Sequence, residues 1–145
     1  MMATSNLMAP AEPATDHRLM DFGEVSAMLA RAISVPDGKL TKFHARLRNF
    51  LRLGWPVVPT TKGKARRFTR DDYIDLAAVT ELTVLGIQPE HAIQIARDNR
   101  RAIHFDPPGT LGPCGVRLSA QIGSGPVRSE TLLYIGHYME AYDAN

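Results

Sequence analysis

The sequence predicts a mainly α-helical domain with one small, strongly cationic hairpin, and three observations support this fold class. Apolar residues recur every three or four positions in several segments between residues 20 and 101. Glycine or proline separates these segments from one another. Residues 39–70 hold ten Lys or Arg residues and no Asp or Glu, interleaved with apolar side chains. A basic segment of this kind folds and presents a cationic face, which is typical of proteins that bind a polyanion.

The composition of the 145-residue chain is that of a globular protein, with 44% hydrophobic and 22% charged residues. Outside residues 39–70 there remain seven basic and 15 acidic residues, so this remainder carries a net charge of −8 although the whole chain carries +2. No apolar run approaches the roughly 18 residues that span a bilayer, and the N-terminus lacks the pattern of a signal peptide. We therefore expect a cytoplasmic protein with no membrane partner.

The N-terminal half predicts a disordered tail followed by two helices. Residues 1–17 are rich in Ala, Pro, Thr and Met and have no periodicity. Residues 22–32 form an amphipathic pattern with Asp21 as a candidate N-cap, and Pro36 and Gly38 then predict a turn. Residues 40–53 predict a second helix, which Gly54 ends.

A hairpin and two further helices are expected next. Gly63 lies between two short arms that predict a β-hairpin over about 57–68, with a cationic tip. Thr69 and Asp72 form an acidic variant of the capping box, which starts a third helix that Gly86 ends. A fourth helix starts at Pro89 and ends near residue 101. The two helices should contribute to the core Tyr73, Leu76, Ala77, Val79, Leu82, Leu85, Ile93, Ile95 and Ala96.

The last third of the chain changes character. Residues 102–127 are rich in Pro and Gly and predict a loop with one short strand or hairpin, and a terminal helix should start near Ser129. We therefore divide the chain into a tail (1–17), a helical domain (18–101) and an accessory or oligomerisation segment (102–145). A terminal apolar stripe could form a homodimer contact or fold back onto its own domain; it consists of Leu132, Ile135, Met139 and Tyr142.

The order of elements is that of a helix-turn-helix protein followed by a hairpin, and a family resemblance supports this. "FGEVSAMLA" resembles the first helix of MerR-type winged-helix proteins, and "LRNFLRLGW" is similar to their "LRYYEREGL" segment. "KARRFTRDDYIDLAAVTELTVLGIQPEHAIQI" resembles their wing and the helices after it. The resemblance covers about residues 21–97. It implies a winged helix-turn-helix fold and a DNA-binding transcriptional regulator, associated with the nucleoid.

Candidate DNA-contacting residues fall into two groups. The helix over about 40–53 would enter the major groove, with Thr41, Lys42 and His44 nearest its N-terminal end, where base contacts are commonest. The wing over about 57–68 would follow the DNA backbone or enter the minor groove. The first group consists of Lys39, Thr41, Lys42, His44, Arg46 and Arg48, and the second of Lys62, Lys64, Arg66, Arg67 and Arg70.

No catalytic, metal or cofactor site is expected, because the histidines have no ligand spacing and Cys114 has no His and acid partners. Three functions stay open. The first is a sequence-preferring regulator that binds double-stranded DNA and could contact RNA polymerase. The second is an architectural DNA-binding protein of the phage excisionase or small terminase type. The third is a protein-interaction adaptor whose basic surface meets an acidic partner.

Overall fold

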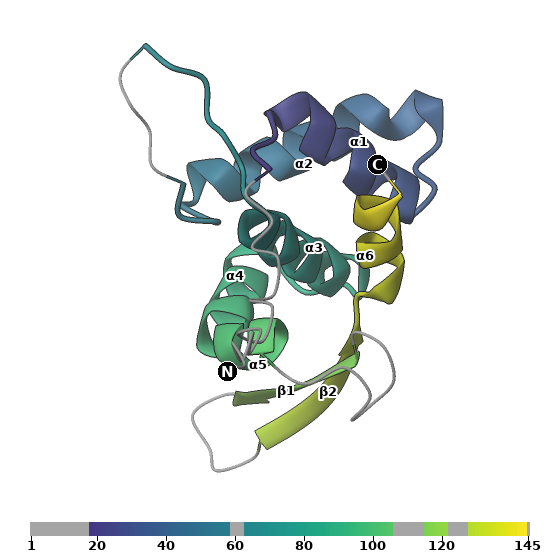
Figure 1. The fold of residues 1–145 in the computed structure, drawn as a ribbon. Helices are drawn as coiled ribbons and strands as arrows, with labels where there is room; N and C mark the ends of the chain where they lie inside the picture. The colour runs from purple at the N-terminus through teal and green to yellow at the C-terminus, as the bar shows by residue number, and fades with distance from the viewer. Residues whose placement is uncertain (1–17, 59–62, 106–114, 122–127, 145) are drawn as a thin grey trace, which may run out of the picture.

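The protein is mainly helical, as the sequence predicts (Figure 1). The computed structural model describes residues 18–58, 63–105, 115–121 and 128–144, so the predicted tail at 1–17, Lys62 and Cys114 lie outside the described residues. The elements are α1 (Phe22–Ala32), the 3₁₀ helix η1 (Asp37–Lys39), α2 (Leu40–Arg52), α3 (Arg70–Val84), α4 (Pro89–Asp98), α5 (Arg100–Phe105), β1 (Gly115–Gln121), β2 (Arg128–Tyr134) and α6 (Gly136–Asp143).

The first two helices begin and end at residues that the sequence marks. The Asp21 carboxylate accepts the backbone N–H of Glu24 at 2.8 Å and caps α1, which satisfies one N–H that the helix itself leaves without a partner. Helix α2 gives way to Gly54, whose φ of 90° lies in the left-handed region that glycine adopts without strain. The apolar face of α2, with Phe43, Leu47 and Phe50, is buried in the core.

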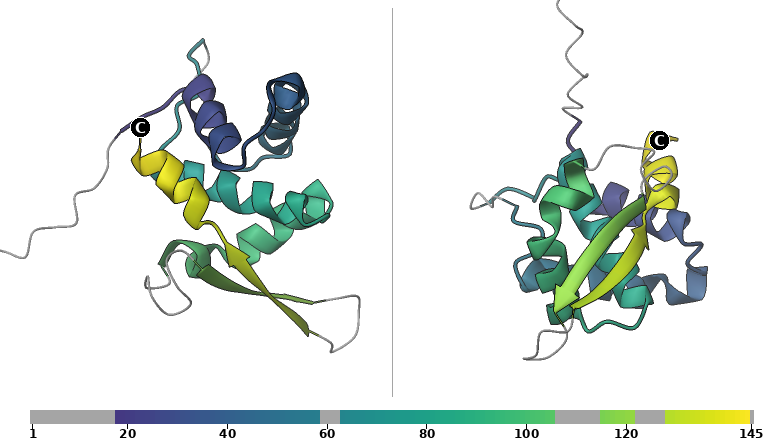
Figure 2. Two further views of the ribbon diagram at one scale, coloured as in Figure 1. Left: turned by 90° about the vertical axis from the view of Figure 1, so that its right-hand side faces the viewer. Right: turned by 90° about the horizontal axis from the view of Figure 1, so that it is seen from below.

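Helix α3 is the central helix of the fold. Its capping box is formed: the Thr69 hydroxyl accepts the Asp72 N–H at 3.2 Å, and the Asp72 carboxylate accepts the Thr69 N–H at 2.9 Å. Every residue from Tyr73 to Thr80 is buried, so neighbours surround the helix on all sides. Helices α1 and α2 lie on one side of α3, and the β1–β2 hairpin lies on the opposite side (Figures 1 and 2).

The C-terminal segment folds back onto the helices. Strands β1 and β2 pair antiparallel, with Arg117 opposite Leu132, and β2 contacts α3. The prediction of a terminal helix from Ser129 is wrong, because residues 128–134 form β2 and the helix begins only at Gly136. Helix α6 then packs beside α1 and α3.

The apolar residues near the C-terminus do not form an exposed stripe, because most of them are buried in the core. Ile135, Met139 and Tyr142 are 3%, 7% and 3% exposed and belong to the same core as α1 to α4, while Leu132 lies in β2. Of the two possibilities that the sequence left open, the fold back onto the chain's own domain is the one observed. The physical reason is the β1–β2 pairing, which brings the terminal helix against α1 and α3.

Two smaller predictions also differ from the structure. Leu85, expected in the core, is the C-cap residue of α3 and is 56% exposed, like its neighbour Val84 at 53%, because the buried part of the helix ends at Leu82. The fourth helix ends at Asp98 and a separate helix, α5, follows the break at Asn99. Within the described ranges, no helix has the length and apolar character needed to cross a bilayer.

Candidate nucleic-acid interface

The outer face of α2 carries the first group of predicted DNA-contacting residues. Since Phe43, Leu47 and Phe50 hold the opposite face in the core, the polar side chains of the helix point outward. His44 is half-buried, with its ring 6.2 Å from the ring of Phe22. The remaining members of the group are all exposed, namely Lys39, Thr41, Lys42, Arg46 and Arg48.

Lys64, Arg66 and Arg67 of the second group lie on the loop segment before α3 (Figure 1), and Lys62 lies outside the described residues. Gly63 has a φ of 84°, and all residues from 63 to 67 are exposed, including Lys64, Arg66 and Arg67. Arg70 is exposed at the first turn of α3, with its guanidinium carbon 5.9 Å from the centre of the Tyr142 ring. The described cations of this loop are therefore exposed to solvent.

The described residues of this loop do not form the predicted hairpin wing. Residues 57–58 and 63–67 make no strand, and the described backbone pairing of the loop is a bridge from Phe68 to Met20. The Phe68 N–H donates to the Met20 carbonyl at 2.8 Å, and the Met20 N–H donates to the Phe68 carbonyl at 2.9 Å. The backbone groups of Phe68 are thus satisfied by the segment before α1 rather than by the facing arm of a hairpin.

The candidate cations are free of internal ion pairs in the part of the chain that the structure describes. The ion pairs found there involve instead Arg100, His104 and His137, which lie in or near α5 and α6. Residues 39–70 contain no acidic side chain that could neutralise the local charge. An exposed cation without an internal partner keeps its full charge for an external anion.

An open groove of about 640 Å³ connects the two groups. Arg48 and Arg52 line it from α2, Arg66 lines it from the loop, and Phe22 lines it from the start of α1. The Arg48 guanidinium carbon lies 5.0 Å from the centre of the Phe22 ring, a cation–π arrangement that holds this long side chain at the groove. One carboxylate, that of the N-cap Asp21, also faces the groove. With three arginines and one carboxylate, the lining of the groove carries net positive charge and suits the phosphate backbone of a nucleic acid.

Sequence reasoning missed the part that Arg52 plays in this groove. Its guanidinium donates to the Asn49 side-chain oxygen at 2.6 Å, a contact one turn back along α2. The signal was available, because Arg52 is four residues after Arg48 and therefore on the same face of the helix. Lys64 and Arg67 are exposed but do not line the groove.

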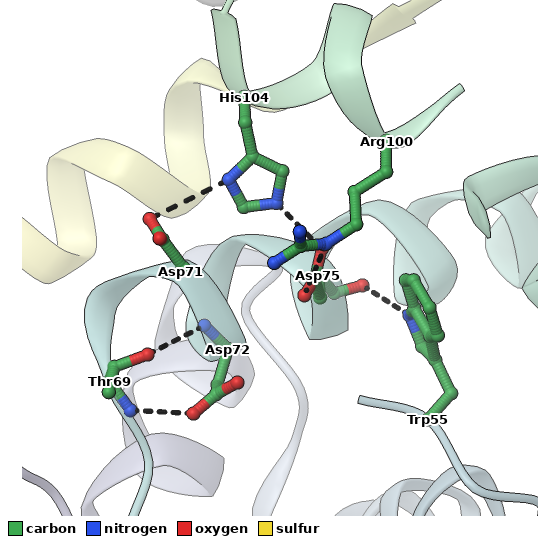
Figure 3. Close-up of polar contacts among 7 residues, drawn as sticks. All are labelled: Trp55, Thr69, Asp71, Asp72, Asp75, Arg100 and His104. Carbon is green, nitrogen blue, oxygen red and sulfur yellow. Dashed lines mark hydrogen bonds and ion pairs between the residues drawn. The ribbon is translucent and has the colours of Figure 1, made fainter. Parts of the chain in front are cut away.

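A polar cluster between α3 and α5, with Asp75 at its centre, was also missed (Figure 3). Asp75 of α3 is 3% exposed, and its carboxylate accepts Arg100 Nε at 3.3 Å to each oxygen. His104 Nε2 lies 2.7 Å from Asp75 Oδ1, and His104 Nδ1 lies 3.6 Å from Asp71 Oδ1. The indole N–H of Trp55 donates to the Asp75 backbone carbonyl at 3.2 Å. An acidic residue inside a run of buried helical positions was the sequence signal for this cluster.

Two buried tyrosines, Tyr73 and Tyr138, have raised pKa values. The Tyr73 hydroxyl donates to the Tyr138 carbonyl at 2.6 Å, and the Tyr138 hydroxyl donates to Glu81 at 2.8 Å. Burial raises the pKa of both tyrosines, and the neighbouring Glu81 charge raises the pKa of Tyr138 further. Burial also raises the pKa of Asp72, against its two hydrogen bonds with Thr69, which lower it.

Comparisons of this chain with protein-family models, with curated proteins and with solved structures found no match.

Proposed function

We propose that this chain binds double-stranded DNA as a helix-turn-helix regulator of MerR-like type, with α2 in the major groove. The loop over about 57–68 takes the place of the β-hairpin wing and lies along the backbone or in the minor groove. The observation that carries the proposal is the set of exposed cations on α2 and on the loop, none with an internal ion pair among the described residues, joined by the groove that holds Arg48, Arg52 and Arg66.

The shape of the cationic surface favours a nucleic acid over a small anion. The α2 helix and the loop offer positive charge along an extended surface, whereas a small anion needs one enclosed cluster. The Phe22 ring supplies an apolar patch beside two arginines, which suits the sugar between two phosphates. Neutralising several phosphates releases counterions, so binding should weaken steeply with salt.

Within this proposal, α2 divides into two parts. Thr41 and Lys42 are exposed at its N-terminal end, where a helix lying in the major groove meets base edges. Arg48 and Arg52 belong to the groove further along the helix and suit phosphates. His44 packs against Phe22 and is therefore a weaker candidate for a base contact.

The first experiment is selection from a random duplex library with the purified full chain, at two salt concentrations. Recovery of a motif supports a sequence-preferring regulator, and the symmetry of that motif reports whether two copies bind together. Salt-sensitive binding without a motif supports the architectural function. No duplex binding at either salt concentration overturns the proposal and favours the adaptor.

The loop is tested with the double variant Arg66→Ala and Arg67→Ala. Each lost phosphate contact should lower the magnitude of the slope of log affinity against log salt concentration by about one. The slope of the double variant should therefore be smaller by about two. Arg101→Glu is the control, since it removes the same two units of charge from an exposed position on α5. An equal change in both variants means that net charge, and not the loop, governs binding.

A further inference from the structure

Buried aromatic residues anchor the cationic loop at both of its ends. At the start, Trp55 is 3% exposed and its indole N–H donates to the Asp75 carbonyl at 3.2 Å. At the end, Phe68 is fully buried and its backbone pairs with Met20. The exposed residues 63–67 lie between these anchors. Where the loop cations stand relative to α2 therefore depends on how firmly each anchor is held.

The Trp55 anchor rests on a charged residue that is costly to bury. A carboxylate removed from water needs compensating partners, or its burial opposes folding. Asp75 obtains them from α5, where Arg100 faces both carboxylate oxygens and His104 lies 2.7 Å from one of them (Figure 3). Asp71 lies on the other side of the His104 ring, 3.6 Å from Nδ1. Loss of a partner from α5 would leave the Asp75 charge poorly compensated and disturb this turn of α3.

We propose that Asp75 is the positioning residue of the loop: its side chain is held by α5 and its backbone carbonyl holds Trp55, so α5 sets the position of the cations that bind DNA. This inference rests on the proposed function. Arg97 of α4 supports the same anchor, with its guanidinium carbon 5.7 Å from the centre of the Trp55 ring. The C-terminal part of the chain thereby acts on the DNA-binding surface without touching DNA.

The first test measures the anchor in the free protein. Trp55 is the only tryptophan of the chain, so fluorescence excited at the red edge of the absorption band, where the four tyrosines do not absorb, reports on this residue alone. His104→Leu is of similar size but has no polar atom that could bind Asp75, and we expect its Trp55 to show stronger quenching by acrylamide and red-shifted emission. Tyr138→Phe is the matched control, because it removes a hydrogen bond to α3 that has no link to the loop. Quenching in His104→Leu equal to that of the unchanged protein overturns the proposal.

The second test is a double-mutant cycle on DNA binding. Trp55→Phe keeps a ring in the core but removes the indole donor. It leaves Asp75 and its partners on α5 in place, whereas Arg100→Ala would remove a partner of the buried Asp75 carboxylate. We expect Trp55→Phe to weaken duplex binding, and we expect Arg66→Ala with Arg67→Ala to weaken binding much less when Trp55→Phe is already present. Sites that act independently would instead show additive effects.

The possible failures are distinguishable. Additive effects in the cycle overturn the positioning role even if DNA binding itself is established. If Arg66→Ala with Arg67→Ala leaves binding unchanged in the otherwise unaltered protein, the proposed role of the loop in DNA binding fails. The quenching measurement on the free protein then still decides whether the contacts of Asp75 with α5 hold Trp55 in place.

Discussion

Arg52 shows how a single side chain can extend the candidate interface beyond the predicted residues. It lines the groove together with Arg48 and Arg66, and its contact with Asn49 holds it near the helix surface. We expect Arg52→Gln to lower the salt slope of duplex binding by about one, because a single phosphate contact is lost. Binding isotherms at several salt concentrations measure the slope. Arg101→Gln, at an exposed position on α5, should leave the slope unchanged, and equal slopes for both variants would remove Arg52 from the interface.

At the scale of residues, the sequence predicts which side chains are exposed better than it predicts which side chains contact one another. Every described member of the two predicted groups except His44 is exposed, because polar residues of an amphipathic helix fall on the face opposite its apolar stripe. The sequence did not reveal that Phe22 faces Arg48, or that Asp75 pairs with residues 25 and 29 positions later. Such contacts depend on how helices cross, and no local pattern encodes that geometry.

At the scale of elements, helices with local start and stop signals were predictable. Asp21, Thr69 and Asp72 form the expected caps, and Gly54 and Gly86 follow the helices they end. The terminal helix was placed too early because Leu132, Ile135 and Met139 fit a helical spacing. Residues 128–134 pair with residues 115–121 as strands. A pairing between distant segments overrides a short local pattern, as is common for strands.

The buried hydroxyls of Tyr73 in α3 and Tyr138 in α6 should make the protein less stable at alkaline pH. Burial raises the pKa of Tyr73 and Tyr138 above the ordinary value of 10.0, so the unfolded chain releases these protons at lower pH than the folded chain does. The stability linked to these protons is therefore complete below about pH 10 and is lost as the pH rises beyond it. Thermal melts at a series of pH values should show the midpoint falling steeply in that range.

The variant Tyr138→Phe tests the contribution of the Tyr138 hydroxyl to stability both at neutral and at alkaline pH. The variant lacks the bond to Glu81 and should lose about 1 kcal/mol at neutral pH. It also lacks one of the two buried ionisable hydroxyls, so its stability should fall less steeply as the pH rises above about 10. A variant with the same alkaline slope as the unchanged protein would show that Tyr138 makes no contribution to it.

At the scale of the whole molecule, positive charge is concentrated on one part and negative charge on the rest. Residues 39–70 supply α2 and the loop, and all 15 acidic residues lie elsewhere. Such an arrangement attracts a polyanion to one surface and repels it from others, which orients the encounter and speeds association at low salt. The segregation was visible in the sequence, whereas its division between a helix and a loop that face one groove required the fold.

Removal of residues 135–145 tests whether the C-terminal segment is an accessory arm or part of the folding unit. Ile135, Tyr138, Met139 and Tyr142 are all buried, and each apolar side chain of this size contributes about 1.5–3 kcal/mol when buried. Their combined loss is comparable with the whole stability of a domain, about 5–15 kcal/mol. We therefore expect the shortened chain to lose its cooperative thermal transition in circular dichroism. An accessory arm would leave the melting midpoint unchanged, because α1 to α4 would then hold their core without it.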